Sequence, residues 1–287
     1  ASGLVDVVLV VGVEKITDEV GAVTDAALAT STDGDYEAVH GLTPTAQAAL
    51  LMRRYMHEYN VPHPAFSGFS VTAHANGATN LYAMYRSAIS ADVYNKAGMV
   101  SDPLNMFDIA PNADGAAALL LTRRELLPEN PAPLVRITGS AMVTDRLAVH
   151  DRLDPLAFTA ARLSVERACH QAGILPGEAD LFELCDSSSI YAALSLEAAG
   201  FAERGSGWQL AQDGHIGLQG RLPIATFGGL KARGNPGGAT GVYQAVEAVL
   251  QLRRQAGPNQ VEPARRALIQ VLAGPASSAV THVLEVI

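Results

Sequence analysis

The sequence predicts a layered α/β fold, because apolar runs of strand length alternate with segments whose apolar residues repeat at helical spacing. The chain has 287 residues, of which 48% are hydrophobic. This is enough apolar material for one large core or two smaller ones.

The N-terminal part is expected to hold two buried strands separated by a long insertion. Residues 7–13 are almost entirely valine and leucine, which predicts a strand buried on both faces in the middle of a parallel sheet. Residues 116–122 predict a second buried strand. Between them, residues 16–111 form an irregular insertion with an amphipathic helix at residues 44–59, where Pro44 suits the first turn. Such a long insertion is usually functional.

The C-terminal part predicts an alternating series of strands and helices. Asp154-Pro155 is expected to cap a helix that Gly173 ends, and Cys169 falls on the apolar face of that helix as a core residue. Further helices are predicted at residues 190–199 and 242–256. The predicted strands are residues 134–141, 180–184, 267–272 and 279–286.

Composition excludes several classes of function. The net charge of -9 argues against nonspecific binding of nucleic acid, which depends on cationic side chains. The two cysteines, Cys169 and Cys185, suggest neither a disulfide scaffold nor a zinc site, and we expect no metal. No apolar run approaches the roughly 20 residues of a membrane span, and the N-terminus lacks the basic n-region expected of a signal peptide. A cytoplasmic protein is therefore predicted.

The most informative stretch is residues 234–241, which read Gly-Asn-Pro-Gly-Gly-Ala-Thr-Gly. It resembles the Gly-His-Pro-x-Gly-x-(Ser/Thr)-Gly loop of thiolases, in which the histidine activates a nucleophilic cysteine. Asn235 stands at the position of that histidine. An amide can orient a carbonyl or a water by hydrogen bonding, but it cannot take a proton near neutral pH.

Other segments, in the same order, are similar to thiolase motifs, closest to those of the sterol-carrier-protein type. They are the Gly-x-Glu strand end at residues 12–14, the start of the covering-loop region at residues 41–56, the His-x-Asn run at residues 74–80, and the Asp-Pro-Leu and Asp-Gly-Ala-Ala runs at residues 102–104 and 114–117. The resemblance implies the five-layer αβαβα thiolase fold with an incomplete N-terminal half. It divides the chain into residues 1–125, with a loop domain at about 16–111 that would cover acyl-CoA, and residues 126–287.

The resemblance also implies that the helix carrying the nucleophilic cysteine would lie before Ala1. Three alternatives stay open: the sequence is truncated, another chain supplies the segment, or the protein works without it.

Candidate site residues come from two further comparisons with the family. Cys185-Asp186-Ser187 matches the start of the His-Asp-Cys-Phe run, with only the aspartate retained. Cys185 follows a strand and precedes a helix, whose dipole would lower the pKa of the thiol, so it is a candidate nucleophile or proton carrier. The alternative is a partly buried cysteine without a chemical role.

Glycine and polar residues complete the predicted site. Gly237 and Gly238 would present backbone N–H groups to an anionic oxygen, and Ser187 is a further candidate for substrate binding. His74 and Asn76 would line the substrate channel, although a lone histidine in a loop is more often structural or solvated. Because ligand sites gather beyond the carboxyl ends of strands, we expect Cys185, Asn235 and Gly238 to converge on one cleft beneath residues 16–111.

Two functions fit the sequence. The first is a thiolase-like enzyme that handles acyl-CoA, as an acyltransferase or a related carbon–carbon lyase, with an altered active site, coenzyme A esters as substrate and no covalently bound cofactor. The second is a noncatalytic subunit that assembles with an active thiolase or an OB-fold partner. In either case we predict a homo- or hetero-oligomer, with a partner covering the sheet edge beside residues 7–13.

Overall fold

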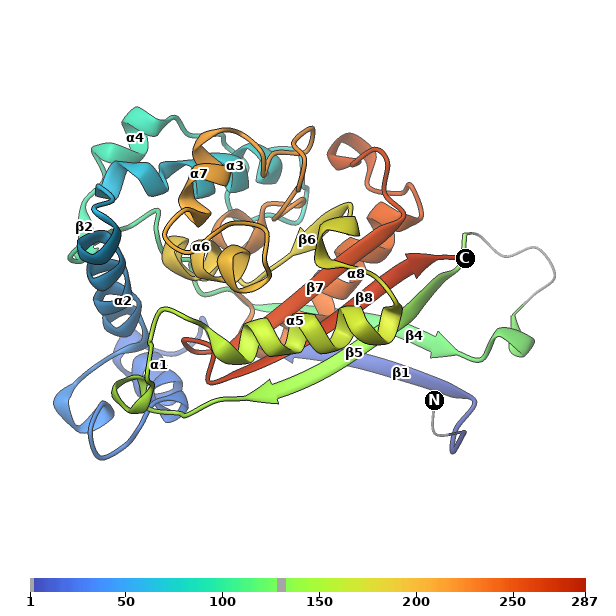
Figure 1. Ribbon diagram of the computed structural model, residues 1–287, viewed down its shortest axis with the longest axis horizontal. Helices are drawn as coiled ribbons and strands as arrows, with labels where there is room; N and C mark the ends of the chain where they lie inside the picture. Colours follow the sequence, from blue (N-terminus) through green and yellow to red (C-terminus); the bar gives the residue numbers. More distant parts are fainter. Residues whose placement is uncertain (1–2, 128–132) are drawn as a thin grey trace.

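The computed structural model describes residues 3–127 and 133–287, which form two main β-sheets on either side of one helix (Figure 1). That helix, α8 (Thr240–Leu252), contacts strands of both sheets. The layered α/β class predicted from the sequence is therefore confirmed.

The C-terminal sheet has four strands in the order β5-β8-β7-β6. β8 runs antiparallel to both β5 and β7, whereas β6 runs parallel to β7. Helix α5 packs against β5 and β8, and α8 packs against β7. The bounds are β5 Val135–Thr144, β6 Leu181–Glu183, β7 Arg266–Ala273, β8 Ser278–Val286 and α5 Thr159–Ala172. All four predicted strands are confirmed.

Helix α5 begins later than the sequence suggested. Asp154 accepts a hydrogen bond from the backbone N–H of Leu156 (3.0 Å) and lies in a separate turn, so the predicted cap is wrong. The residue before the helix is Phe158, in a left-handed conformation with φ 43° and no side-chain cap. Gly173 ends the helix at φ 69°, as predicted, and Cys169 is buried in the core.

The N-terminal sheet consists of β1 (Val7–Glu14) and β4 (Gly115–Thr122), paired antiparallel. The prediction of strands buried on both faces of a parallel sheet is wrong. One face packs on α8, where a Cβ on Gly12 would meet Ala239 and Val242. The other face is open, which leaves most of β1 exposed.

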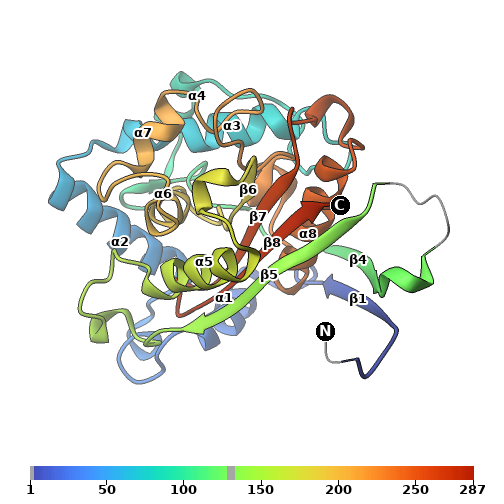
Figure 2. The same cartoon turned by 45° about the vertical axis from the view of Figure 1, so that its right-hand side comes forward.

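The segment between β1 and β4 is largely helical and lies beside the C-terminal sheet (Figure 2). The predicted helix at residues 44–59 is confirmed, with Thr43 Oγ1 accepting from the N–H of Ala46 (3.2 Å). The elements are α1 Gly21–Leu28, α2 Pro44–Tyr59, α3 Ser67–Gly77, α4 Ala91–Asn95, β2 Met99–Ser101 and β3 Leu104–Asn105. The prediction that this segment covers acyl-CoA, and the division at residue 125, stay predictions.

Two further α-helices and a π-helix lie between the strands of the C-terminal part. They are α6 Ser189–Ala198, α7 Gly207–Gln212 and a five-residue π-helix at Gly229–Arg233. The main core lies between α2, α3, α5 and α6, and a smaller one lies around α8, as in the pair formed by Ala248 and Leu252. Among the described residues, no helix is long and apolar enough to span a membrane.

The close packing of α5 on β5 gives a test of the fold. A Cβ added to Gly139 would collide with the backbone carbonyl of Ala168, at a point where the register of β5 shifts against β8. We expect Gly139→Ala to lower the free energy of unfolding by about 1–3 kcal/mol, because the backbones must separate. Gly177→Ala, which meets no atom within 4 Å, is the matched control. Equal urea midpoints for the two variants would contradict this packing.

Candidate functional site

Residues 109–113 lie against both loops that the sequence singled out. Ile109 forms an antiparallel bridge with Ser188, and Asn112 forms a parallel bridge with Asn235. The N–H of Ala110 donates to Ser187 O and the N–H of Asn235 donates to Pro111 O, both at 2.9 Å. The loops after β6 and before α8 thus share one neighbour. That Cys185, Asn235 and Gly238 line a single cleft stays a prediction.

In the side-chain amide of Asn235, the oxygen is hydrogen-bonded and the nitrogen is not. Thr240 Oγ1 donates to Asn235 Oδ1 at 3.1 Å, which fixes the amide plane. The residue is half-buried, and Nδ2 has no partner in the part of the chain that the structure describes. Asn235 therefore presents a fixed and unpaired hydrogen-bond donor at the start of α8.

Asp186 holds the π-helix that leads to Asn235. Its Oδ1 accepts from the N–H of Leu230 at 2.7 Å, and the residue is only 2% exposed. A Cβ on Gly229, whose φ is 53°, would collide with the same carboxylate, so the close approach requires glycine there. Burial raises the pKa of Asp186. These contacts hold the π-helix in place, and the catalytic role predicted for Asp186 stays a prediction.

Lys231, in the same π-helix, was not identified from the sequence. It is 1% exposed, and its Nζ donates to the backbone oxygens of Asp108 (2.5 Å) and Phe107 (3.2 Å). Burial lowers the pKa of Lys231 to about 8, although Asp108 and Asp186 favour its charged form. The signal available in the sequence was a lone lysine in an apolar, glycine-rich stretch.

A third buried charge, Arg233, ends the π-helix. Its Nε lies 2.8 Å from Glu247 Oε1 on α8, and its guanidinium lies 4.7 Å from the centre of the Tyr243 ring. Burial raises the pKa of Glu247 to about 8. The π-helix before Asn235 thus contacts a different part of the fold through each of Leu230, Lys231 and Arg233.

The surroundings of Cys185 disfavour its thiolate form, and a catalytic role for this residue stays a prediction. It is buried, its Sγ donates to Ser187 Oγ at 3.6 Å, and burial raises the pKa of its thiol. The expectation of a lowered pKa is wrong, because desolvation outweighs the dipole of α6, whose first turn is already capped by Ser188. Ser187 is half-buried beside it.

The two glycines of the loop are exposed, but one N–H is already used. Gly238 N–H donates to Glu14 Oε2 at 3.0 Å, and a Cβ on Gly237 would lie 2.5 Å from the same oxygen. The carboxylate of Glu14, at the end of β1, therefore occupies the position predicted for an anionic ligand at Gly238.

His74 and Asn76 lie in helix α3, not in a loop, and both are buried. His74 stacks on Tyr85, and its Nδ1 lies 3.3 Å from the carbonyl of Ser87. Asn76 Nδ2 donates to Ala225 O at 3.0 Å. That the two residues line a substrate channel stays a prediction.

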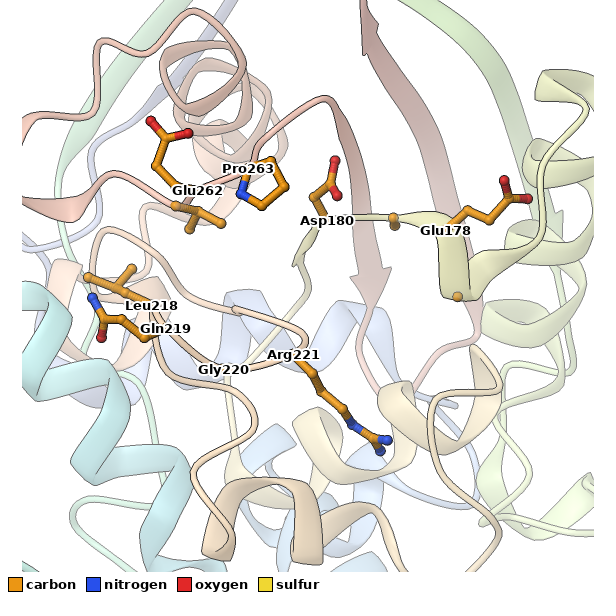
Figure 3. Close-up of a pocket in the computed structure, with 11 residues that line it drawn as sticks. Glu178, Asp180, Leu218, Gln219, Gly220, Arg221, Glu262 and Pro263 are labelled. Atoms are coloured by element: carbon orange, nitrogen blue, oxygen red, sulfur yellow. The ribbon is translucent and has the colours of Figure 1, made fainter.

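A pocket of about 390 Å³ lies at the opposite end of β6 from Cys185 (Figure 3). Its lining includes Asp180, Arg221 and Glu262, and none of the predicted site residues. Asp180 Oδ2 accepts from the backbone of Arg266 at 2.8 Å, which ties it to the sheet. Within residues 3–127 and 133–287, no group of three or more His, Cys, Asp or Glu could hold a metal ion.

Comparison with known proteins identifies the family. Residues 141–286 match the thiolase C-terminal domain-like family. An acetyl-CoA acetyltransferase of Methanothermobacter thermautotrophicus is 37% identical over 283 residues, which cover 99% of this chain and 73% of that relative. The chain belongs to the thiolase family.

Further relatives agree with membership of the sterol-carrier-protein type of thiolase. Sterol carrier protein 2 of Bos taurus is 29% identical over 278 residues, covering 93% of this chain and 51% of that protein. A solved structure described as an Ltp2-ChsH2(DUF35) aldolase superposes with a TM-score of 0.87 at 25% identity, covering 99% of this chain and 74% of that one. The thiolase-like fold is thereby confirmed.

The buried Lys231 of this thiolase-family chain predicts a distinctive pH dependence. Its pKa is about 8 in the folded chain against an ordinary value of 10.5, so between these pH values the unfolded chain binds more protons. The free energy of unfolding should rise with pH across this window, by at most about 1.4 kcal/mol per pH unit from this group. Denaturation of wild type and Lys231→Met at pH 7 to 10.5 measures the difference.

The exposed Lys96 provides the control, because Lys96→Met should keep the wild-type dependence on pH. A difference between wild type and Lys231→Met that stays constant from pH 7 to pH 10.5 would refute the lowered pKa.

Proposed function

We propose that this chain handles an acyl-CoA thioester and that Asn235 Nδ2 donates a hydrogen bond to the thioester oxygen. Membership of the thiolase family and similarity to acetyl-CoA acetyltransferase support the substrate class. The observation that carries the proposal is the fixed, unpaired amide donor beside the N-terminus of α8. A preorganised hydrogen-bond donor stabilises a transition state most when negative charge develops on the oxygen that accepts from it.

Cleavage of a carbon–carbon bond of the aldol type is the reaction that fits best. In this reaction a β-hydroxyacyl thioester gives a carbonyl compound and an acyl thioester, and the hydroxyl proton is balanced by the proton gained at the α-carbon. No acyl-cysteine is needed, and both Cys169 and Cys185 are buried with raised thiol pKa values. The related solved structure described as an aldolase supports this choice.

A noncatalytic subunit is the second candidate. The N–H of Gly238 already donates to Glu14, so the loop has one donor fewer for a ligand. Cys185 lacks the surroundings of a nucleophile, because burial raises the pKa of its thiol. The related structure is described as an Ltp2-ChsH2(DUF35) aldolase, which supports assembly of this chain with a second chain. Binding of acyl-CoA without turnover would favour this candidate.

Binding of matched ligands tests the role of Asn235. Acetyl-CoA has the thioester oxygen, and its thioether analogue S-ethyl-CoA lacks it. We expect wild type to bind acetyl-CoA about tenfold more tightly in calorimetry, since a hydrogen bond contributes about 1.4 kcal/mol. Asn235→Ala should bind both ligands equally.

Asn95→Ala, at an exposed position of α4, is the control and should keep the preference. The proposed contact would be rejected by a wild-type protein that binds the two ligands equally. A wild-type protein that binds neither ligand would reject the substrate class as well.

Thiolysis provides a separate test of the reaction type. We expect no detectable cleavage of acetoacetyl-CoA by free coenzyme A, because neither cysteine is activated and Asn235 is no base. Asn235→His alone should not restore the activity. Any turnover by wild type would contradict this expectation, and turnover that persists in Cys185→Ser would require another nucleophile.

A further inference from the structure

The carboxylate of Asp108 lies at the centre of a buried hydrogen-bond network beside the candidate site. Asp108 is 0% exposed, and its Oδ1 accepts from the hydroxyl of Tyr94 in α4 at 2.5 Å. Its Oδ2 lies 2.7 Å from Nε2 of His63, in the turn before α3, and accepts from the N–H of Asn105 at 3.0 Å. Because an ionised carboxylate only accepts hydrogen bonds, Nε2 of His63 is the donor in this contact.

The surroundings of Asp108 keep its carboxylate ionised. Burial alone would raise its pKa, but the hydrogen bond from His63 and the charge of Lys231 lower it. Burial raises the pKa of Tyr94, so its hydroxyl stays protonated and remains a donor. The rings of His63 and Tyr94 stack with 5.2 Å between their centres. Both donors are therefore fixed by packing as well as by hydrogen bonding.

The main chain of Asp108 contacts both elements that flank the candidate site. Its carbonyl oxygen accepts from Lys231 Nζ at 2.5 Å and from the N–H of Ser189, at the start of α6, at 2.9 Å. Lys231 belongs to the π-helix that precedes Asn235. One peptide group therefore joins the network to the π-helix and to the turn after β6.

Residues 109–113 connect Asp108 to Asn235. The N–H of Asn235 donates to Pro111 O at 2.9 Å, and the N–H of Ala113 donates to Asn235 O at 3.1 Å. Both backbone groups of Asn235 are thus held by a segment that begins at Asp108. A shift of Asp108 moves the start of this segment, and the direction of the Asn235 amide follows from the position of its backbone.

We propose that Tyr94 and His63 position the side-chain amide of Asn235. They act through Asp108 and residues 109–113, so they are positioning residues. Loss of either donor is expected to turn Nδ2 of Asn235 away from the thioester oxygen. The effect on ligand binding rests on the proposed function, whereas the orientation of the amide can be measured without a ligand.

Tyr55 provides a matched control for Tyr94. Both tyrosines are 0% exposed, and each hydroxyl donates to a carboxylate at 2.5 Å, which for Tyr55 is that of Glu197. Glu197 also accepts from the N–H of Gly207, which lies outside the segment that leads to Asn235. Tyr55→Phe and Tyr94→Phe therefore remove the same kind of hydrogen bond, and only Tyr94→Phe should affect Asn235.

Calorimetry with acetyl-CoA and S-ethyl-CoA measures the effect on binding. We expect Tyr94→Phe to reduce the preference for acetyl-CoA from about tenfold to about threefold or less, because coupling through packed networks changes affinities by about two- to thirtyfold. Tyr55→Phe should keep the preference. His63→Leu should lose it as Tyr94→Phe does, whereas His63→Gln, whose Nε2 can still donate, should keep it. In Asn235→Ala, which binds both ligands equally, adding Tyr94→Phe should leave their ratio unchanged.

NMR of isotope-labelled protein measures the orientation of the amide without a ligand. The side-chain amide signal of Asn235 is identified by its loss in Asn235→Ala. We expect this signal to shift in Tyr94→Phe and to stay in place in Tyr55→Phe. Melting temperatures show that both variants are folded at the temperature of measurement. If Tyr94→Phe does not fold, His63→Leu compared with His63→Gln gives the same test.

Three results would overturn the inference. They are a thioester preference that survives Tyr94→Phe, an Asn235 signal that Tyr94→Phe leaves unchanged, and an equal shift of that signal in Tyr55→Phe. A wild-type protein without the thioester preference, whose Asn235 signal shifts only in Tyr94→Phe, would support the positioning role and reject the proposed contact with the substrate.

Discussion

The contact between the Asp186 carboxylate and the N–H of Leu230 is the constraint on which the candidate site depends. It joins the turn after β6 to the π-helix before Asn235, and it requires glycine at position 229. A buried carboxylate is costly unless it is paired, and Lys231 supplies a neighbouring charge that also binds the backbone at Asp108. A π-helix has poor intrinsic stability, so these buried groups explain why it persists.

Helix α8 connects the candidate site with both sheets of the fold. Its N-terminus holds Asn235 through Thr240, and its second half holds Arg233 through Glu247. The same helix supports β7 on one side and β1 with β4 on the other. Both sheets therefore take their positions from the element that fixes the candidate donor, and a change in the packing of either sheet can move Asn235.

The sequence predicted the elements well where local patterning decides them, as in helix α2, with its proline at the first turn, and strands β7 and β8. It failed where the outcome depends on distant neighbours. The valines of β1 indicated burial, but which faces are covered depends on packing partners. The thiol of Cys185 illustrates the same limit, since its pKa depends on how deeply the folded chain buries it.

Asparagine at position 235, where the resemblance to thiolases leads one to expect histidine, is compatible with the fold because the loop does not depend on that side chain. Its backbone N–H and C=O are paired with Pro111 and Ala113, and the π-helix before it is held by Asp186. Among the residues that the structure describes, only Thr240 forms a hydrogen bond with the side-chain amide. The chemistry at position 235 can therefore change while the scaffold stays the same, which is why family membership identifies the fold of this chain more firmly than its reaction.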